Sequence, residues 1–117
     1  NKHHEYPQKI FEINKVFDYD QEKLYCAVAL CHEKATFTEM KQVLDRISAA
    51  FEKKYTIEPI KEEGCIEGRT GEIKIEKKKI GIIGEVHPTV LVNWKLQMPV
   101  TFLEIDLEIL CSVVMKE

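Results

Sequence analysis

The sequence predicts one α+β domain spanning residues 1–117, in which one long amphipathic helix and short helices accompany a mostly antiparallel sheet. Three observations support this prediction. Several short segments alternate apolar and polar residues, or are apolar throughout, and turn residues bound them. The segment 36–51 instead repeats its apolar residues at helical spacing. The 117 residues are 44% hydrophobic, which suffices for one core and excludes a disordered tail.

The first part of the chain predicts a loop followed by two strands. Residues 1–8 are polar and include Pro7, which is typical of a loop. Residues 10–17 carry apolar side chains on both sides of a predicted strand, and the polar residues 18–22 form a turn. Residues 24–31 are apolar on both faces, as expected of a central strand.

The clearest helix begins at Thr36, because Thr36 and Glu39 have the spacing of a capping box. It is expected to end near Lys53 and Lys54, whose positive charge suits the carboxyl end of a helix dipole. Its apolar stripe consists of Met40, Val43, Leu44, Ile47, Ala50 and Phe51.

A short strand and a hairpin follow this helix. Pro59 restricts the strand predicted at 55–60 to a sheet edge or a strand end. Ile73 and Ile75 then alternate with polar residues in a first hairpin strand, which ends at the turn 76–79. Residues 80–86 form the second strand of this hairpin. A four-residue turn keeps one face apolar, and it predicts the opposed pairs Ile75–Ile80, Ile73–Ile82, Thr70–Glu85 and Arg69–Val86.

The last part predicts two short helices on either side of a strand. His87 is a predicted N-cap, with Pro88 at the first helical position, where a missing amide donor costs nothing. Pro99 separates this helix from a strand at 100–106, and the apolar residues 107–114 predict a short terminal helix.

Charge and cysteine spacing exclude several classes of function. The net charge of −3 and pI of about 5.9 argue against an independent RNA-binding module, and the lysines at 77–79 are expected in a solvated turn. No cysteine pair has the spacing of a zinc ribbon, so four reduced thiols are expected. No apolar run is long enough for a membrane span and no signal peptide is visible, so a cytoplasmic location is expected.

Seven short motifs follow one another along the chain: 7–13 (PQKIFEI), 35–41 (ATFTEMK), 68–69 (GR), 81–88 (GIIGEVHP), 93–96 (NWKL), 98–100 (MPV) and 102–107 (FLEIDL). In this order and spacing they resemble the synthetase-like module of archaeal and eukaryotic-type phenylalanyl-tRNA synthetase beta subunits. The chain departs from the family at Asn14, where a Gly is frequent, and at Cys65 or Ile66, where an aromatic residue is usual. These departures leave a paralogue or a divergent lineage as alternatives.

The resemblance implies a partial core of the class II aminoacyl-tRNA synthetase type, cut from a longer beta subunit. It implies packing against the catalytic alpha subunit, with tRNA reached only through the holoenzyme. ATP and magnesium would serve the holoenzyme and not this domain. A homodimer of the isolated domain is expected if the face that the alpha subunit covers is apolar.

The closing strand argues against catalysis by this chain. An active core of this class needs arginine for the phosphates of ATP and a glycine-rich closing strand. Residues 100–110 contain neither, but include Glu104, Asp106 and Glu108. No catalytic, cofactor-binding or metal-binding residue is therefore predicted. The alternative function is a paralogue that retains a pocket for ATP or an amino acid.

Six residues remain candidates for structural or interface roles. Arg69 and Glu85 are either a substrate clamp or an ion pair across the hairpin, and the ion pair is favoured. His87, followed by Pro88, is a helix cap in preference to a general base. Trp94 and Phe102 are equally compatible with partner anchors and with core residues.

Overall fold

The computed structural model describes residues 8–18 and 21–115, which form an α+β fold with one six-stranded antiparallel sheet and three helices. The strands lie in the order β1-β2-β6-β5-β4-β3, so β1 and β3 are the edges. In chain order the elements are β1 (Gln8–Asp18), β2 (Gln21–Cys31), α1 (Phe37–Phe51), β3 (Thr56–Pro59), β4 (Cys65–Ile75), β5 (Lys78–Val86), α2 (Pro88–Asn93), β6 (Val100–Asp106) and α3 (Leu107–Val114).

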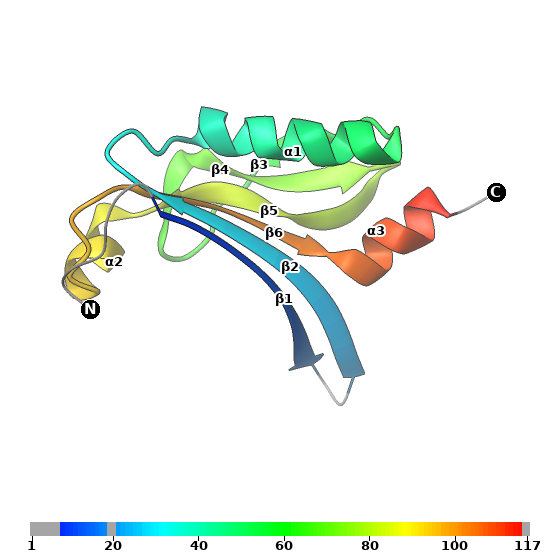
Figure 1. The fold of residues 1–117 in the computed structure, drawn as a ribbon, viewed down its shortest axis with the longest axis horizontal. Helices are drawn as coiled ribbons and strands as arrows, with labels where there is room; N and C mark the ends of the chain where they lie inside the picture. Colours follow the sequence, from blue (N-terminus) through cyan, green and yellow to red (C-terminus); the bar gives the residue numbers. More distant parts are fainter. Residues whose placement is uncertain (1–7, 19–20, 116–117) are drawn as a thin grey trace.

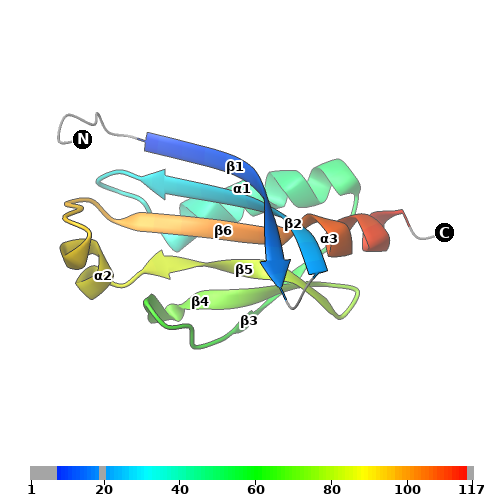
Figure 2. The same cartoon turned by 90° about the horizontal axis from the view of Figure 1, so that it is seen from below.

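The helices lie unevenly about the sheet. In Figure 1, α1 runs along one face, α3 leaves one end of the sheet, and α2 lies at the opposite end. Figure 2 shows the other face, where the strands are visible without a helix across them. We call the side that carries α1 the helix face and the other side the open face.

The hydrophobic core lies between the sheet and the two longer helices. Met40 and Leu44 of α1 are fully buried, as are Leu110 and Val113 of α3. Burying each large apolar side chain contributes about 1.5–3 kcal/mol, so packing is the main force that holds these helices on the sheet. From the strands, the core receives Cys26, Val28, Leu30, Ile73, Ile75, Ile80, Ile83, Leu103 and Ile105.

Local sequence signals fix where the helices begin and end. The Thr36 hydroxyl accepts a hydrogen bond from the Glu39 amide at 3.2 Å, which confirms the predicted start of α1. α1 ends at Phe51, and Glu52 follows with a left-handed φ of 56°. The predicted cap His87 and the predicted strand after Pro99 are also confirmed.

The predicted register of the β4–β5 hairpin is wrong. Glu76 and Lys77 both have positive φ, so they form a two-residue turn of the kind that favours hairpins, and Ile75 lies opposite Lys78. A register shift then follows, which sets Ile73 opposite Gly81 and Thr70 opposite Gly84. The extra residue, a β-bulge near Ile80, returns the apolar side chains to the helix face.

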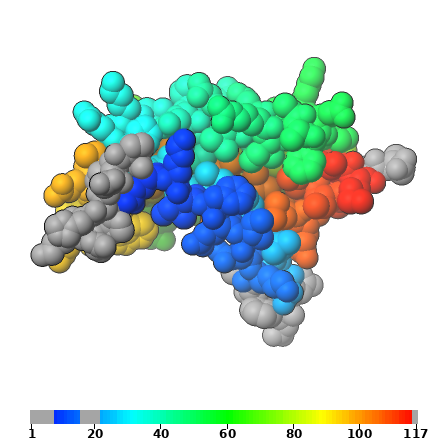
Figure 3. Space-filling view, viewed as in Figure 1, coloured from blue at the N-terminus to red at the C-terminus, as the bar shows by residue number. Residues whose placement is uncertain are grey.

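The β1 edge carries apolar side chains that no described element covers. Ile10 is 51% exposed, Phe11 65% and Ile13 57%. Figure 3 shows β1 at the surface. In Figure 1, the last part of β1 and the first part of β2 project away from the rest of the sheet. A long edge strand of this kind is one to which another chain can add.

Candidate functional site

A buried carboxylate at one end of the sheet joins three elements. Glu85 Oε2 accepts a hydrogen bond from the Phe37 amide at 2.6 Å, at the first turn of α1. Its Oε1 is 3.2 Å from Arg69 Nη1, which confirms the predicted ion pair. The Glu85 side chain is 10% exposed and that of Arg69 is 63% exposed, so Glu85 is the fixed partner. The three residues link β5, α1 and β4.

His87 has the geometry of a cap. Its Nδ1 accepts a hydrogen bond from the Thr89 amide at 3.1 Å, and Pro88 occupies the first turn of α2. The His87 amide donates to the Gly64 carbonyl at 2.8 Å, which ties α2 to the start of β4. Pro88 lines a hollow of about 510 Å³ together with Arg69 and Glu85. The structure thus gathers three of the candidate residues around one hollow.

The glycines of β5 allow neighbouring strands to approach closely. A Cβ on Gly81 would lie 2.0 Å from the Glu104 carbonyl oxygen. A Cβ on Gly84 would lie 3.2 Å from the Phe102 ring, because the two residues are opposite each other on the open face. Phe102 therefore packs across β5, in a space that only glycine leaves free.

Trp94 and Phe102 line one hollow on the open face, and its volume is about 680 Å³. Trp94 is 65% exposed, so it does not belong to the core, whereas Phe102 is half-buried. We call this hollow the aromatic groove, and its apolar wall consists of Ile10, Ala29, Val86, Trp94, Val100 and Phe102.

Four glutamates lie in one line across the open face. The register pairs Glu12 with Ala27, Ala27 with Glu104 and Glu104 with Ile82. The same line continues through Glu72 to Glu58 at the opposite edge. The sequence places Glu104 on the closing strand, but its alignment with Glu12, Glu72 and Glu58 depends on the strand order, which the sequence did not reveal.

Lysines neutralise only one end of this line. Lys74 Nζ is 3.1 Å from Glu58 and 3.6 Å from Glu72, and Lys79 Nζ is 3.7 Å from Glu72. The hydrogen bond to Glu58, followed by the charge of that carboxylate, raises the pKa of Lys74. Within the described part of the chain, the Glu104 carboxylate forms no hydrogen bond or ion pair. Negative charge therefore remains next to the aromatic groove.

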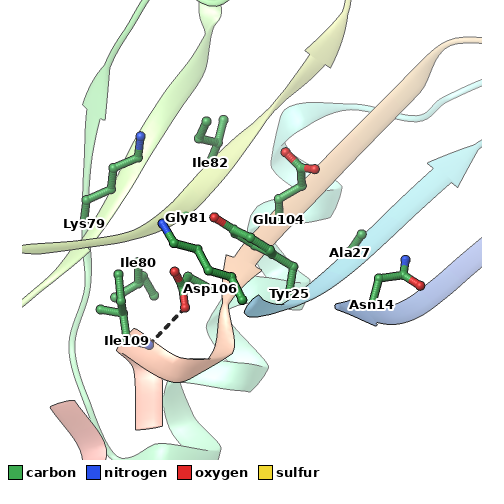
Figure 4. Close-up of a pocket in the computed structure, with 11 residues that line it drawn as sticks. Asn14, Tyr25, Ala27, Lys79, Ile80, Gly81, Ile82, Glu104, Asp106 and Ile109 are labelled. Atoms are coloured by element: carbon green, nitrogen blue, oxygen red, sulfur yellow. Dashed lines mark hydrogen bonds between the residues drawn. The ribbon is translucent and has the colours of Figure 1, made fainter. Parts of the chain in front are cut away.

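A second cleft, of about 570 Å³, lies beside the groove on the open face. Figure 4 shows Tyr25, Lys79, Glu104 and Asp106 around it. Asp106 is not free for a ligand, because its Oδ1 accepts the amides of Glu108 and Ile109 at the start of α3. Sequence reasoning missed Tyr25 and Lys79, since their proximity depends on the β2–β6–β5 order.

Among residues 8–18 and 21–115, no group of three or more His, Cys, Asp or Glu side chains is placed to hold a metal ion. None of the helices in the same ranges has the length and apolarity needed to cross a membrane.

Comparisons with known proteins agree with the motifs. The sequence profile described as "Phenylalanyl tRNA synthetase beta chain CLM domain" matches residues 1–107. The chain is 46% identical over 114 residues to the phenylalanine--tRNA ligase beta subunit of Thermococcus sibiricus, and this match covers 92% of the chain and 20% of the relative. The corresponding subunit of Pyrococcus furiosus is 41% identical over 115 residues (92% and 21%), and that of Archaeoglobus fulgidus 36% over 107 residues (92% and 20%). The chain thus spans about a fifth of the length of these curated relatives.

Proposed function

The chain belongs to the family of phenylalanyl-tRNA synthetase beta chain CLM domains, and we propose that it is a non-catalytic assembly domain that packs on the catalytic alpha subunit. We further infer that its sheet is a partial core of the class II synthetase type. In this proposal the holoenzyme joins phenylalanine to its tRNA with ATP and magnesium. The chemistry belongs to the alpha subunit, and tRNA meets this domain only through the holoenzyme.

The charge of the open face carries this proposal. A triphosphate on the sheet requires cations, above all guanidinium groups that bind phosphate in a bidentate manner. The chain has two arginines: Arg46 lies on α1, and Arg69 is bonded to Glu85. The open face presents Glu104, and Asp106 lies at the end of the same strand. These carboxylates oppose nucleotide binding and leave the apolar surface for protein contact.

The assembly role can be tested with the full-length beta subunit that contains this chain. We expect that deleting residues 1–117 abolishes co-purification with the alpha subunit and that the added domain competes with the intact beta subunit for it. A deleted beta subunit that binds the alpha subunit with unchanged affinity would show that the assembly role is wrong. Circular dichroism of the deleted protein serves as the control for its folding.

The second candidate function is a domain that retains a small-molecule pocket, and the cleft in Figure 4 favours it. Calorimetry of the domain with ATP, phenylalanine and a phenylalanyl-adenylate analogue separates the two candidates. The assembly proposal predicts no heat of binding at millimolar ligand. Saturable binding that Tyr25→Ala removes would favour the pocket and overturn our preference.

A further inference from the structure

The floor of the aromatic groove is made of small residues. Ala27 and Ala29 of β2 lie between β1 and β6, where larger side chains would fill the hollow. Ala29 has Ile10 of β1 opposite it on one side and Phe102 of β6 opposite it on the other. Apolar side chains therefore flank this alanine. The indole of Trp94 adds a large exposed apolar surface at the same hollow. Aromatic side chains in such positions dominate the energetics of protein interfaces.

Two carboxylates flank the other alanine of the floor. Glu12 and Glu104 are directly opposite Ala27 on its two sides, and all three residues line the groove. Neighbouring strands are about 4.8 Å apart, so the backbones of the two glutamates are separated by about 10 Å across the alanine. One ammonium or guanidinium group above Ala27 can therefore interact with both carboxylates.

These charges restrict what can occupy the groove. Asn14 donates one hydrogen bond to the Glu12 carboxylate at 2.8 Å, whereas the Glu104 carboxylate has no hydrogen bond or ion pair within residues 8–18 and 21–115. A nucleic acid would be repelled, because its phosphates need basic side chains. A purely apolar occupant would remove water from two carboxylates without compensation. The occupant that fits is apolar and cationic at once.

We propose that the aromatic groove receives a segment of a partner protein that presents an apolar side chain next to a lysine or arginine. The apolar side chain lies over Ala29, between Ile10 and Phe102, and reaches Trp94 in the same hollow, whereas the cation lies over Ala27, between Glu12 and Glu104. This inference rests on the proposed function, because it assigns the groove as the contact with the alpha subunit. It adds the chemistry of the segment that the groove recognises.

The test measures the affinity of the full-length beta subunit for the alpha subunit by surface plasmon resonance. Glu104→Lys is expected to weaken binding at least tenfold, and Glu104→Gln is expected to weaken it less and to reduce its dependence on salt. Trp94→Ala is also expected to weaken binding at least tenfold. The matched controls are Glu63→Lys and Met115→Ala, which alter exposed residues outside the groove and should change affinity less than twofold.

The outcomes separate this inference from the proposed function. If every groove variant binds like the parent protein while deletion of the domain abolishes binding, the groove assignment is wrong and the assembly role stands. If the deleted protein also binds normally, the assembly role itself fails. Tighter binding by Glu104→Lys would mean an anionic occupant. If Trp94→Ala abolishes a beta–beta dimer but leaves the affinity for the alpha subunit unchanged, the occupant of the groove is a second copy of this chain. Either result overturns the inference.

Discussion

Glu85 is the residue on which the joint between the helix and the sheet depends. Its carboxylate accepts the Phe37 amide and faces Arg69, and only 10% of its side chain is exposed. Removing a buried acceptor costs more than removing an exposed partner, because the remaining donor stays buried without a hydrogen bond. The two sides of this ion pair should therefore differ in their effect on stability.

We predict that Glu85→Ala lowers the free energy of unfolding by about 2–3 kcal/mol, since it removes a charged acceptor from the start of α1. Arg69→Ala should cost below about 1 kcal/mol, because its side chain is 63% exposed and solvent screens the pair. Urea unfolding of both variants checks this difference. Equal losses in the two variants would contradict the role assigned to the Phe37 amide.

Tyr55 provides a prediction at alkaline pH. Its hydroxyl donates a hydrogen bond to Asp45 of α1, and burial, followed by this bond and the charge of Asp45, raises the pKa of Tyr55. A folded-state pKa above the unfolded value near 10 gives stability that is complete below about pH 10 and is lost as the pH rises further. Tyr55→Phe should cost about 1 kcal/mol at pH 8 and lose less stability than the parent between pH 9 and 11. Parallel curves for the two proteins would refute this assignment.

At the scale of elements, the sequence predicted more of the helices than of the hairpin. Thr36 and His87 predict the starts of α1 and α2, because a helix cap is a contact between residues that are close in the chain. The register of β4 and β5 depends on a two-residue turn at Glu76 and Lys77, which lack the Asn-Gly pattern of such turns. A lysine with a φ of 69° is held there by the pairing on either side and not by its own preference.

The same turn gives a test of local strain. Lys77→Gly should stabilise the domain by about 0.5–1 kcal/mol, because glycine adopts positive φ without the strain that a Cβ causes. The matched control is Lys78→Gly in the adjoining strand, which should destabilise by a similar amount. Thermal unfolding of the two variants measures both effects. Destabilisation by Lys77→Gly would mean that this turn is not strained.

At the scale of the whole molecule, the candidate site emerged only from the strand order. The sequence identified Arg69 and Glu85 as an ion pair, because both lie on one hairpin. It left Trp94 and Phe102 undecided between core and interface, because that choice depends on how β1, β2 and β6 lie together. The line of glutamates that crosses the sheet was likewise hidden, because Glu12, Glu58, Glu72 and Glu104 lie far apart along the chain.

We infer that the open face is a surface for another protein, whereas the helix face encloses the core. Exposed Ile10 and Trp94, the small floor of β2 and the unneutralised Glu104 all lie on the open face or at its end. α1 presents charged residues such as Lys41 and Asp45 to solvent. A partner should therefore cover the open face and leave the outer side of α1 exposed to solvent.

Hydrogen–deuterium exchange of the full-length beta subunit, with and without the alpha subunit, tests this central claim most directly. We predict slower exchange on binding in peptides that contain residues 8–14 and 94–104, and unchanged exchange in residues 37–51. Slower exchange confined to residues 37–51, with residues 8–14 and 94–104 unaffected, would contradict it.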